Sequence, residues 1–180
     1  MMDRLVFPPT VDALVRTLGP KLTPAVKDAL RGHGLDLDKP LLPAWPAEHL
    51  PAWLGIFATA LAPDEPRDVA LRRLGRGFIA AWRGTVLGIA IGGVLRVVGP
   101  RRSLTRITRA FRAGDNYIEV RIEDLGPGHA LAHLSDASGM PAYYLGVLEA
   151  GAELTGAKNV VIELVGETPP SAVFRLRYEE

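Results

Sequence analysis

The sequence predicts an α+β fold in which a helical N-terminal two-thirds packs on a four-stranded antiparallel sheet in ββαββ order. Two observations carry this prediction. Up to residue 114, apolar residues recur every three or four positions, as in amphipathic helices. From residue 115 onward they alternate with polar residues, as in half-buried strands. Because 180 residues with 48% hydrophobic side chains suffice for one core, we expect residues 1–180 to form a single domain.

Residues 1–63 are expected to form short helices and a proline-rich connector. Thr10 is predicted to cap a first helix, and Thr23, followed by Pro24, to cap a second that ends at Gly32. Three prolines within residues 39–46 exclude a helix there, because proline lacks an amide donor and restricts the residue before it. Apolar side chains at helical spacing indicate a third helix: Leu50, Trp53, Leu54, Phe57 and Leu61.

Residues 64–114 are expected to supply the core helices. The first of them has an apolar stripe comprising Leu71, Leu74, Gly75, Phe78 and Trp82. Residues 84–95 carry no charge, so a helix there would be buried on nearly every side. A further helical segment follows Gly99 and Pro100, and its inward face comprises Leu104, Ile107 and Phe111.

Residues 115–180 are expected to contain two hairpins with a helix between them. The predicted elements are a strand at 118–123, a turn at 125–128, a strand at 129–135, a helix from Pro141 to Gly156, a strand at 160–164, a turn at 166–170 and a strand at 173–178. This segment therefore supplies all four strands of the sheet.

Composition excludes several classes of protein. The 21 basic and 20 acidic residues leave a net charge of +1, so bulk charge does not attract nucleic acid. The absence of cysteine excludes disulfides, thiolate metal sites and cysteine nucleophiles. No apolar run approaches the ~20 residues of a membrane span, and the N-terminus has no signal-peptide pattern. We expect a cytoplasmic protein that binds no nucleic acid and spans no membrane.

No catalytic or metal-binding motif is present, so no catalytic residue, metal ligand or cofactor is assigned. His129 and His133 are close in sequence, but residues four apart on a strand are separated by about 13 Å, too far to share one zinc ion. The sequence also lacks the Gly-x-Ser-x-Gly pattern of a serine nucleophile elbow.

The charges are distributed unevenly along the chain. Residues 1–63 are balanced, residues 64–114 carry a net +8, and residues 115–180 carry a net −7. The basic segment also contains glycines at every fourth position, where a second backbone can approach closely: Gly84, Gly88 and Gly92. Together these features predict a homodimer with facing basic and acidic surfaces. The alternative is that the glycines and charges pair inside one chain.

Aromatic residues from several segments are expected to meet where helices cover the sheet. They are Phe78, Trp82, Phe111, Tyr117, Tyr143 and Tyr144. Tyr and Trp combine an apolar body with a polar tip, which suits a pocket for a hydrophobic ligand. Arg112 and Asn116 are the candidate polar groups that would orient it. The alternative is an ordinary filled core.

Four segments carry a resemblance to a known family: residues 35–44, 70–78, 99–102 and, above all, 111–119. Together they resemble a family of paralogous proteins of unknown function that is expanded in myxobacteria. The family's Phe-Arg-x-Gly-Asn-Asn-Tyr segment is matched here at 111–117, with Asp115 in place of the first Asn. This change should keep the turn and add a charge.

The order of elements is also remotely similar to a superfamily of haem–nitric-oxide-binding sensors, 4-vinyl reductase domains and lipid-binding subunits of a vesicle-tethering complex. This resemblance implies a cavity between helices and sheet for a small, mostly apolar ligand. The Tyr-x-Ser-x-Arg motif of the haem sensors is absent, and no histidine lies within residues 64–114. These two departures from the haem sensors disfavour haem, but they do not disfavour an apolar cavity.

Three functions follow as hypotheses. The first is a non-enzymatic, cytoplasmic, regulatory domain that binds a small hydrophobic or aromatic molecule and signals through an oligomer interface. The second is a protein-interaction or scaffold module with a filled core and no ligand. The third is an enzyme that acts on a small molecule in the same cavity.

Overall fold

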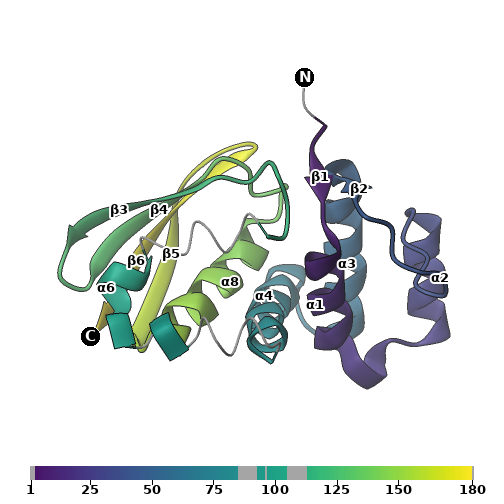
Figure 1. Ribbon diagram of the computed structural model, residues 1–180, viewed down its shortest axis with the longest axis horizontal. Helices are drawn as coiled ribbons and strands as arrows, with labels where there is room; N and C mark the ends of the chain where they lie inside the picture. Colours follow the sequence, from purple (N-terminus) through teal and green to yellow (C-terminus); the bar gives the residue numbers. More distant parts are fainter. Residues whose placement is uncertain (1–2, 85–92, 96, 105–112, 180) are drawn as a thin grey trace.

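The computed structural model describes residues 3–84, 93–95, 97–104 and 113–179. Its helices are α1 (Pro8–Leu18), α2 (Pro24–Gly32), α3 (Leu50–Leu61), α4 (Arg67–Arg83), α6 (Pro100–Leu104) and α8 (Pro141–Leu154), with 3-10 turns at Gly19–Lys21 and Ala47–His49. Its strands are β1 (Leu5–Val6), β2 (Trp45–Pro46), β3 (Val120–Gly126), β4 (His129–Leu134), β5 (Lys158–Thr168) and β6 (Ser171–Glu179). The predicted α+β fold is confirmed (Figure 1).

The first helices differ from expectation in one detail. Thr23 caps α2 as predicted, since its Oγ1 accepts a hydrogen bond from the amide of Val26 at 3.4 Å. Thr10, however, does not cap α1, because α1 begins earlier, at Pro8, after Phe7. The Thr10 hydroxyl instead donates to the carbonyl oxygen of Gly114 at 2.9 Å. A long-range contact has replaced the local cap.

The proline-rich connector is non-helical, as predicted, but its end also forms a strand. Val6 pairs with Trp45 and Leu5 with Pro46, which joins β1 and β2 in a two-stranded antiparallel sheet. Periodicity did not predict this sheet, because two-residue strands are too short to show an alternating pattern.

The main sheet has the strand order β3-β4-β6-β5, and all neighbouring strands are antiparallel. The second hairpin is longer than expected. β5 continues through Thr168, and a bulge between Leu164 and Gly166 keeps Gly166 paired with Val173. The predicted turn at 166–170 is therefore confined to the residues between Thr168 and Ser171.

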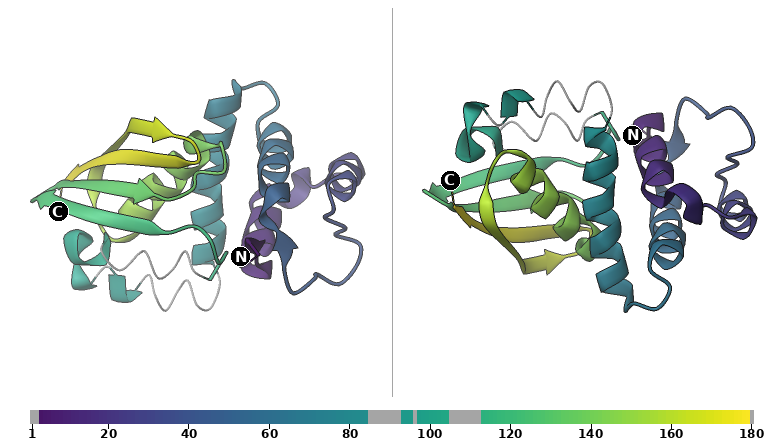
Figure 2. Two further views of the ribbon diagram at one scale, coloured as in Figure 1. Left: turned by 90° about the horizontal axis from the view of Figure 1, so that it is seen from above. Right: turned by 90° about the horizontal axis from the view of Figure 1, so that it is seen from below.

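Helix α8 covers one face of this sheet, and α4 crosses next to α8 with α1, α2 and α3 on its far side (Figures 1 and 2). The buried residues on the covered face of the sheet are Val120, Ala130, Ala132, Leu134, Ile162, Ala172, Phe174, Leu176 and Tyr178. They pack with buried residues of α8 that include Val147, Leu148 and Ala152. This layer joins the helical and strand-forming parts of the chain in one apolar core.

Helices α4 and α8 are in backbone contact at two glycines. A Cβ atom on Gly75 of α4 would overlap the carbonyl oxygen of Tyr143, and one on Gly146 of α8 would overlap the carbonyl oxygen of Arg72. The contact is reciprocal, so each helix presents a side-chain-free patch to the other. No larger residue fits at either position without separating the helices.

Ion pairs flank this glycine contact. Glu149 is buried on α8 and accepts two hydrogen bonds from Arg72, one of them from Nε at 2.9 Å. One turn further along, Arg76 donates to Glu153 at 2.9 Å, and this pairing is the largest cause of a raised Arg76 pKa. Arg72 and Arg76 of α4 thus neutralise acidic residues of α8 within one chain.

Gly146→Ala should destabilise the protein strongly because the added methyl group meets the Arg72 carbonyl across the helix crossing. Overpacking of this kind costs about 1–3 kcal/mol and sometimes more, and we expect the upper end because backbone must move. Chemical denaturation measures the loss.

The matched control is Gly55→Ala in α3, where an added Cβ meets no atom within 4 Å. This change should stabilise the chain by about 0.5–1 kcal/mol through helix propensity. Equal effects of the two substitutions would contradict the assigned crossing.

Candidate functional site

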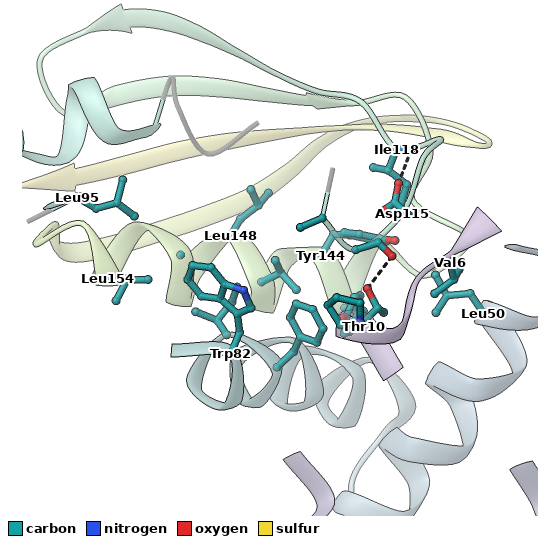
Figure 3. A pocket seen from close by; sticks show the side chains of 18 residues that line it. Val6, Thr10, Leu50, Trp82, Leu95, Asp115, Ile118, Tyr144, Leu148 and Leu154 are labelled. Carbon is teal, nitrogen blue, oxygen red and sulfur yellow. Dashed lines mark hydrogen bonds between the residues drawn. The ribbon is translucent and has the colours of Figure 1, made fainter. Parts of the chain in front are cut away.

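A cavity of about 100 Å³ lies between α4, α8, the N-terminal segment and the segment before β3 (Figure 3). Its described lining residues are Val6, Pro9, Thr10, Leu50, Phe78, Ile79, Trp82, Leu95, Ala113, Gly114, Asp115, Ile118, Tyr143, Tyr144, Val147, Leu148, Gly151 and Leu154. Most are apolar, so the site favours an apolar molecule.

Four of the predicted site residues line this cavity. Phe78 and Trp82 project from α4, and Tyr143 and Tyr144 project from α8. The rings of Phe78 and Tyr143 meet edge to face with centroids 6.0 Å apart, and those of Tyr143 and Tyr144 do so at 5.1 Å. Packing of this kind holds the aromatic walls in defined positions.

The structure places Asn116 away from this lining. Its side-chain amide donates to the carbonyl of Asp3 at 2.9 Å, and its Oδ1 accepts from the amide of Leu5 at 2.8 Å. Asn116 therefore holds β1 beside the segment before β3, and an orienting role toward a ligand would be indirect.

Tyr117 also lies outside the described lining. The Arg4 guanidinium lies 4.5 Å from the centre of its ring, and its hydroxyl lies 3.3 Å from Ser138 Oγ. Burial raises the pKa of Tyr117 to about 12. The remaining two predicted residues, Phe111 and Arg112, lie outside the described residues.

The cavity has a polar end that sequence reasoning did not assign to it. Thr10 and Asp115 lie at this end with Tyr144, whereas Trp82 and Leu154 lie at the other (Figure 3). The only sequence signal for the polar end was the charge that Asp115 introduces into a family motif.

Asp115 is 8% exposed, and its carboxylate organises the turn before β3. Oδ1 accepts hydrogen bonds from the amides of Tyr117, at 3.1 Å, and Ile118, at 2.7 Å. Burial raises the pKa of Asp115, although these two hydrogen bonds oppose the shift. The turn is thus kept, as the sequence led us to expect, while a carboxylate is added to the cavity.

The tyrosines of the cavity are held in their neutral form. Burial is the main cause of a raised pKa for both Tyr143 and Tyr144. Tyr144 shares a contact of 3.5 Å with Ser138 Oγ, whereas no hydrogen bond links the Tyr143 hydroxyl to any described residue. Both phenols are therefore available as neutral hydrogen-bonding groups.

Of the three glycines predicted to form a seam between two copies, Gly84 is the one that lies within the described residues. Gly84 follows α4, and the nearest atom to an added Cβ would be the carbonyl oxygen of Ala81, at 3.3 Å. Gly88 and Gly92 lie outside the described residues, so the seam between two copies stays a prediction.

Within the part of the chain that the structure describes, no three His, Cys, Asp or Glu side chains are grouped so as to hold a metal ion. His133 contacts Glu123 at 2.9 Å, and His49 stacks on Trp53 with ring centroids 5.9 Å apart. None of the described helices has both the length and the hydropathy needed to cross a membrane.

The fold places this chain among proteins with the H-NOX architecture. A doubly substituted Tt H-NOX domain superimposes with a TM-score of 0.70 at 14% identity, covering 96% of this chain and 94% of that one. An H-NOX mutant from K. algicida in its unliganded Fe(II) form gives 0.67 at 12% identity, covering 96% of each chain. An oxygen-binding H-NOX domain related to soluble guanylate cyclases gives 0.61 at 13% identity, covering 94% and 93%.

The chain itself belongs to the family described as "protein of unknown function (DUF2378)", whose profile matches residues 4–179. The resemblance to a family of unknown function is thereby confirmed. A search of curated proteins finds no match to the sequence.

Haem does not fit the cavity as the structure describes it. Another similar structure, with a TM-score of 0.60, comes from work on modulating heme redox potential. The cavity here has no histidine, cysteine or methionine among its described lining residues, and residues 85–92 and 105–112 contain none. Tyrosine ligates haem in some proteins, but the raised pKa of Tyr143 and Tyr144 disfavours the phenolate form.

The stability of the Asp115→Asn variant, measured relative to that of the wild type, should increase as the pH rises. In the wild type, burial raises the folded-state pKa of Asp115, so the folded chain keeps this proton to a higher pH than the unfolded chain. Ionisation therefore costs stability above the unfolded pKa of about 3.9, and asparagine avoids this cost while keeping an acceptor for the two amides.

Urea denaturation at about pH 3 and about pH 7, on either side of that unfolded pKa, measures the effect. The free energy of unfolding of Asp115→Asn, relative to wild type, should be larger at the higher pH. The control is Asp64→Asn, at an exposed position, which should show no such increase. A difference that falls with pH would mean that the folded protein stabilises the Asp115 carboxylate.

Proposed function

We propose that this protein is a non-enzymatic sensory or regulatory domain that binds a small hydrophobic or aromatic molecule in the cavity between α4 and α8. The observation that carries the proposal is the aromatic cavity of about 100 Å³ with one polar end. Apolar pockets with a few polar groups are typical of small-molecule sites.

The size of the cavity limits the ligand. An engineered cavity of about 150 Å³ binds benzene, whereas pockets for drug-sized ligands measure about 300–1,000 Å³. The space here therefore suits a short chain or a single small ring, and a larger ligand would have to displace the walls.

The residues that line the cavity come from several separate elements, which supports a regulatory role. The cavity is lined from the N-terminal segment by Val6 and Thr10, from α4 by Trp82, and from α8 by Val147. A ligand that contacts these elements unequally would shift their packing, which is the physical requirement for a binding signal.

The H-NOX-like fold supports a ligand-binding sensor as a class, because proteins of that architecture include an oxygen-binding domain. A cytoplasmic location and membership of a myxobacterial paralogous group belong to the same proposal. Both rest on the sequence.

Trp82 offers a direct test because it is the one cavity residue among the three tryptophans of the chain, whereas Trp45 and Trp53 pack against each other elsewhere. Titration with small aromatic and aliphatic compounds should change its fluorescence, and native mass spectrometry should detect the complex. The signal should disappear in Trp82→Phe even if that variant binds.

A cavity-filling substitution tests the location of the site. Val147→Phe, at a cavity-lining position that is 3% exposed, should abolish binding, whereas Val69→Phe, on the exposed side of α4, should not. A compound that binds both variants equally would contradict the site. No binding or thermal shift across the panel would favour a scaffold with a filled core, and conversion of a bound compound would favour an enzyme.

We also propose a homodimer that joins copies along the predicted line of Gly84, Gly88 and Gly92. Charge complementarity weakens as salt shortens the Debye length, whereas close helix packing does not. Light scattering at micromolar concentration should therefore give a dimer mass at both low and high salt. A monomer mass under both conditions would reject the dimer.

A further inference from the structure

Two buried residues that line the cavity each have a polar atom without a hydrogen-bond partner among the described residues. Oδ1 of Asp115 accepts two backbone hydrogen bonds, but no donor reaches Oδ2. The hydroxyl of Tyr143 likewise makes no hydrogen bond to a described residue, and it lies near Asp115, since burial and, after it, the Asp115 carboxylate raise the Tyr143 pKa. These side chains belong to residues that are only 8% and 4% exposed, and both residues line the cavity, so their free polar atoms are available to a molecule inside it.

Among the described residues, the charge around this end of the cavity is negative. Asp136, also buried, adds to the raised Asp115 pKa, and Arg4 pairs with Asp136 rather than with Asp115. No lysine, arginine or histidine occurs among the described lining residues. A carboxylate or phosphate in the cavity would therefore meet a buried carboxylate without a described cation to offset the repulsion.

We propose that the ligand carries one terminal hydrogen-bond donor, a hydroxyl or an amine, which binds Asp115 and Tyr143 while its apolar body extends toward Trp82. This inference rests on the proposed function and adds the chemical class of the ligand. It also implies an orientation, because the polar end of the cavity contains Thr10 and Asp115 and the opposite end contains Trp82 and Leu154 (Figure 3).

Each group has a distinct part in this recognition. Asp115 is held by the amides of Tyr117 and Ile118, so it is positioned before the ligand arrives. A hydroxyl would donate to Asp115 Oδ2 and accept from the Tyr143 phenol, whereas an ammonium would donate to both. The proton of the Thr10 hydroxyl is already donated to Gly114, so Thr10 can act toward the ligand only as a further acceptor.

Four probes with the same ring and different ends test the proposal in the full chain: benzyl alcohol, benzylamine, toluene and benzoate. Calorimetric titration at neutral pH should give the tightest binding for the first two, about 10- to 100-fold weaker binding for toluene, and none for benzoate. Asp115→Leu should remove the advantage of the alcohol and the amine over toluene. Tyr143→Phe should reduce it.

The control is Asp136→Asn, which removes a nearby carboxylate outside the described lining and should leave the ranking of the probes unchanged. Benzoate that binds as tightly as benzyl alcohol, or toluene that binds as tightly as either donor, would overturn the donor inference while leaving a ligand-binding cavity in place. Binding of none of the four, with correct folding shown by circular dichroism, would overturn the inference. The absence of binding across the wider panel would then overturn the proposed function as well.

Discussion

The backbone contact of α4 with α8 at Gly75 and Gly146 is the constraint on which the rest of the structure depends. It brings the backbones of α4 and α8 together, since an added Cβ on either residue would overlap a carbonyl oxygen of the other helix. Phe78 lies one turn beyond this crossing on α4, and Trp82 lies a further turn on. Phe78 packs edge to face on Tyr143 of α8, and Phe78, Trp82 and Tyr143 all line the cavity. The position of the cavity therefore follows from the place where no side chain separates the helices.

A second set of contacts closes the polar end of the cavity. Phe7 donates its amide to the carbonyl of Gly114 at 2.9 Å, and Thr10 donates its hydroxyl to the same oxygen. Asn116 bonds to the backbone of Asp3 and Leu5. The N-terminal segment is thus attached directly to the turn that positions Asp115. Any movement of that turn on binding would be transmitted to the first helix, which gives the proposed sensor a physical route for its signal.

Some charges of the basic segment, residues 64–114, pair with charges of the acidic segment, residues 115–180, within one chain. Arg72 and Arg76 of the basic segment pair with Glu149 and Glu153 of the acidic segment, and Arg101 of α6 pairs with Asp124 of β3 at 2.7 Å. These pairs lie beside the helix crossing and at the sheet edge, so they help to orient the elements. They also reduce the charge that remains for contact between copies, which leaves close helix packing as the main support for the proposed dimer.

Sequence periodicity by itself determined the fold class and the order of the main helices and strands, and aromatic residue type indicated four of the cavity residues, because each is a local property of the chain. Phe78 and Trp82 lie on an apolar helical stripe, and Tyr143 and Tyr144 begin the helix between two hairpins. Periodicity shows which side of an element faces inward, but not what it meets there. The tertiary structure alone decided that Thr10 binds Gly114 instead of capping a helix, that Asn116 holds the N-terminal strand, and that Asp115 enters the cavity. These contacts join residues more than 100 positions apart, and a short polar side chain gives the same local signal whether it ends a helix, forms a turn or lines a site.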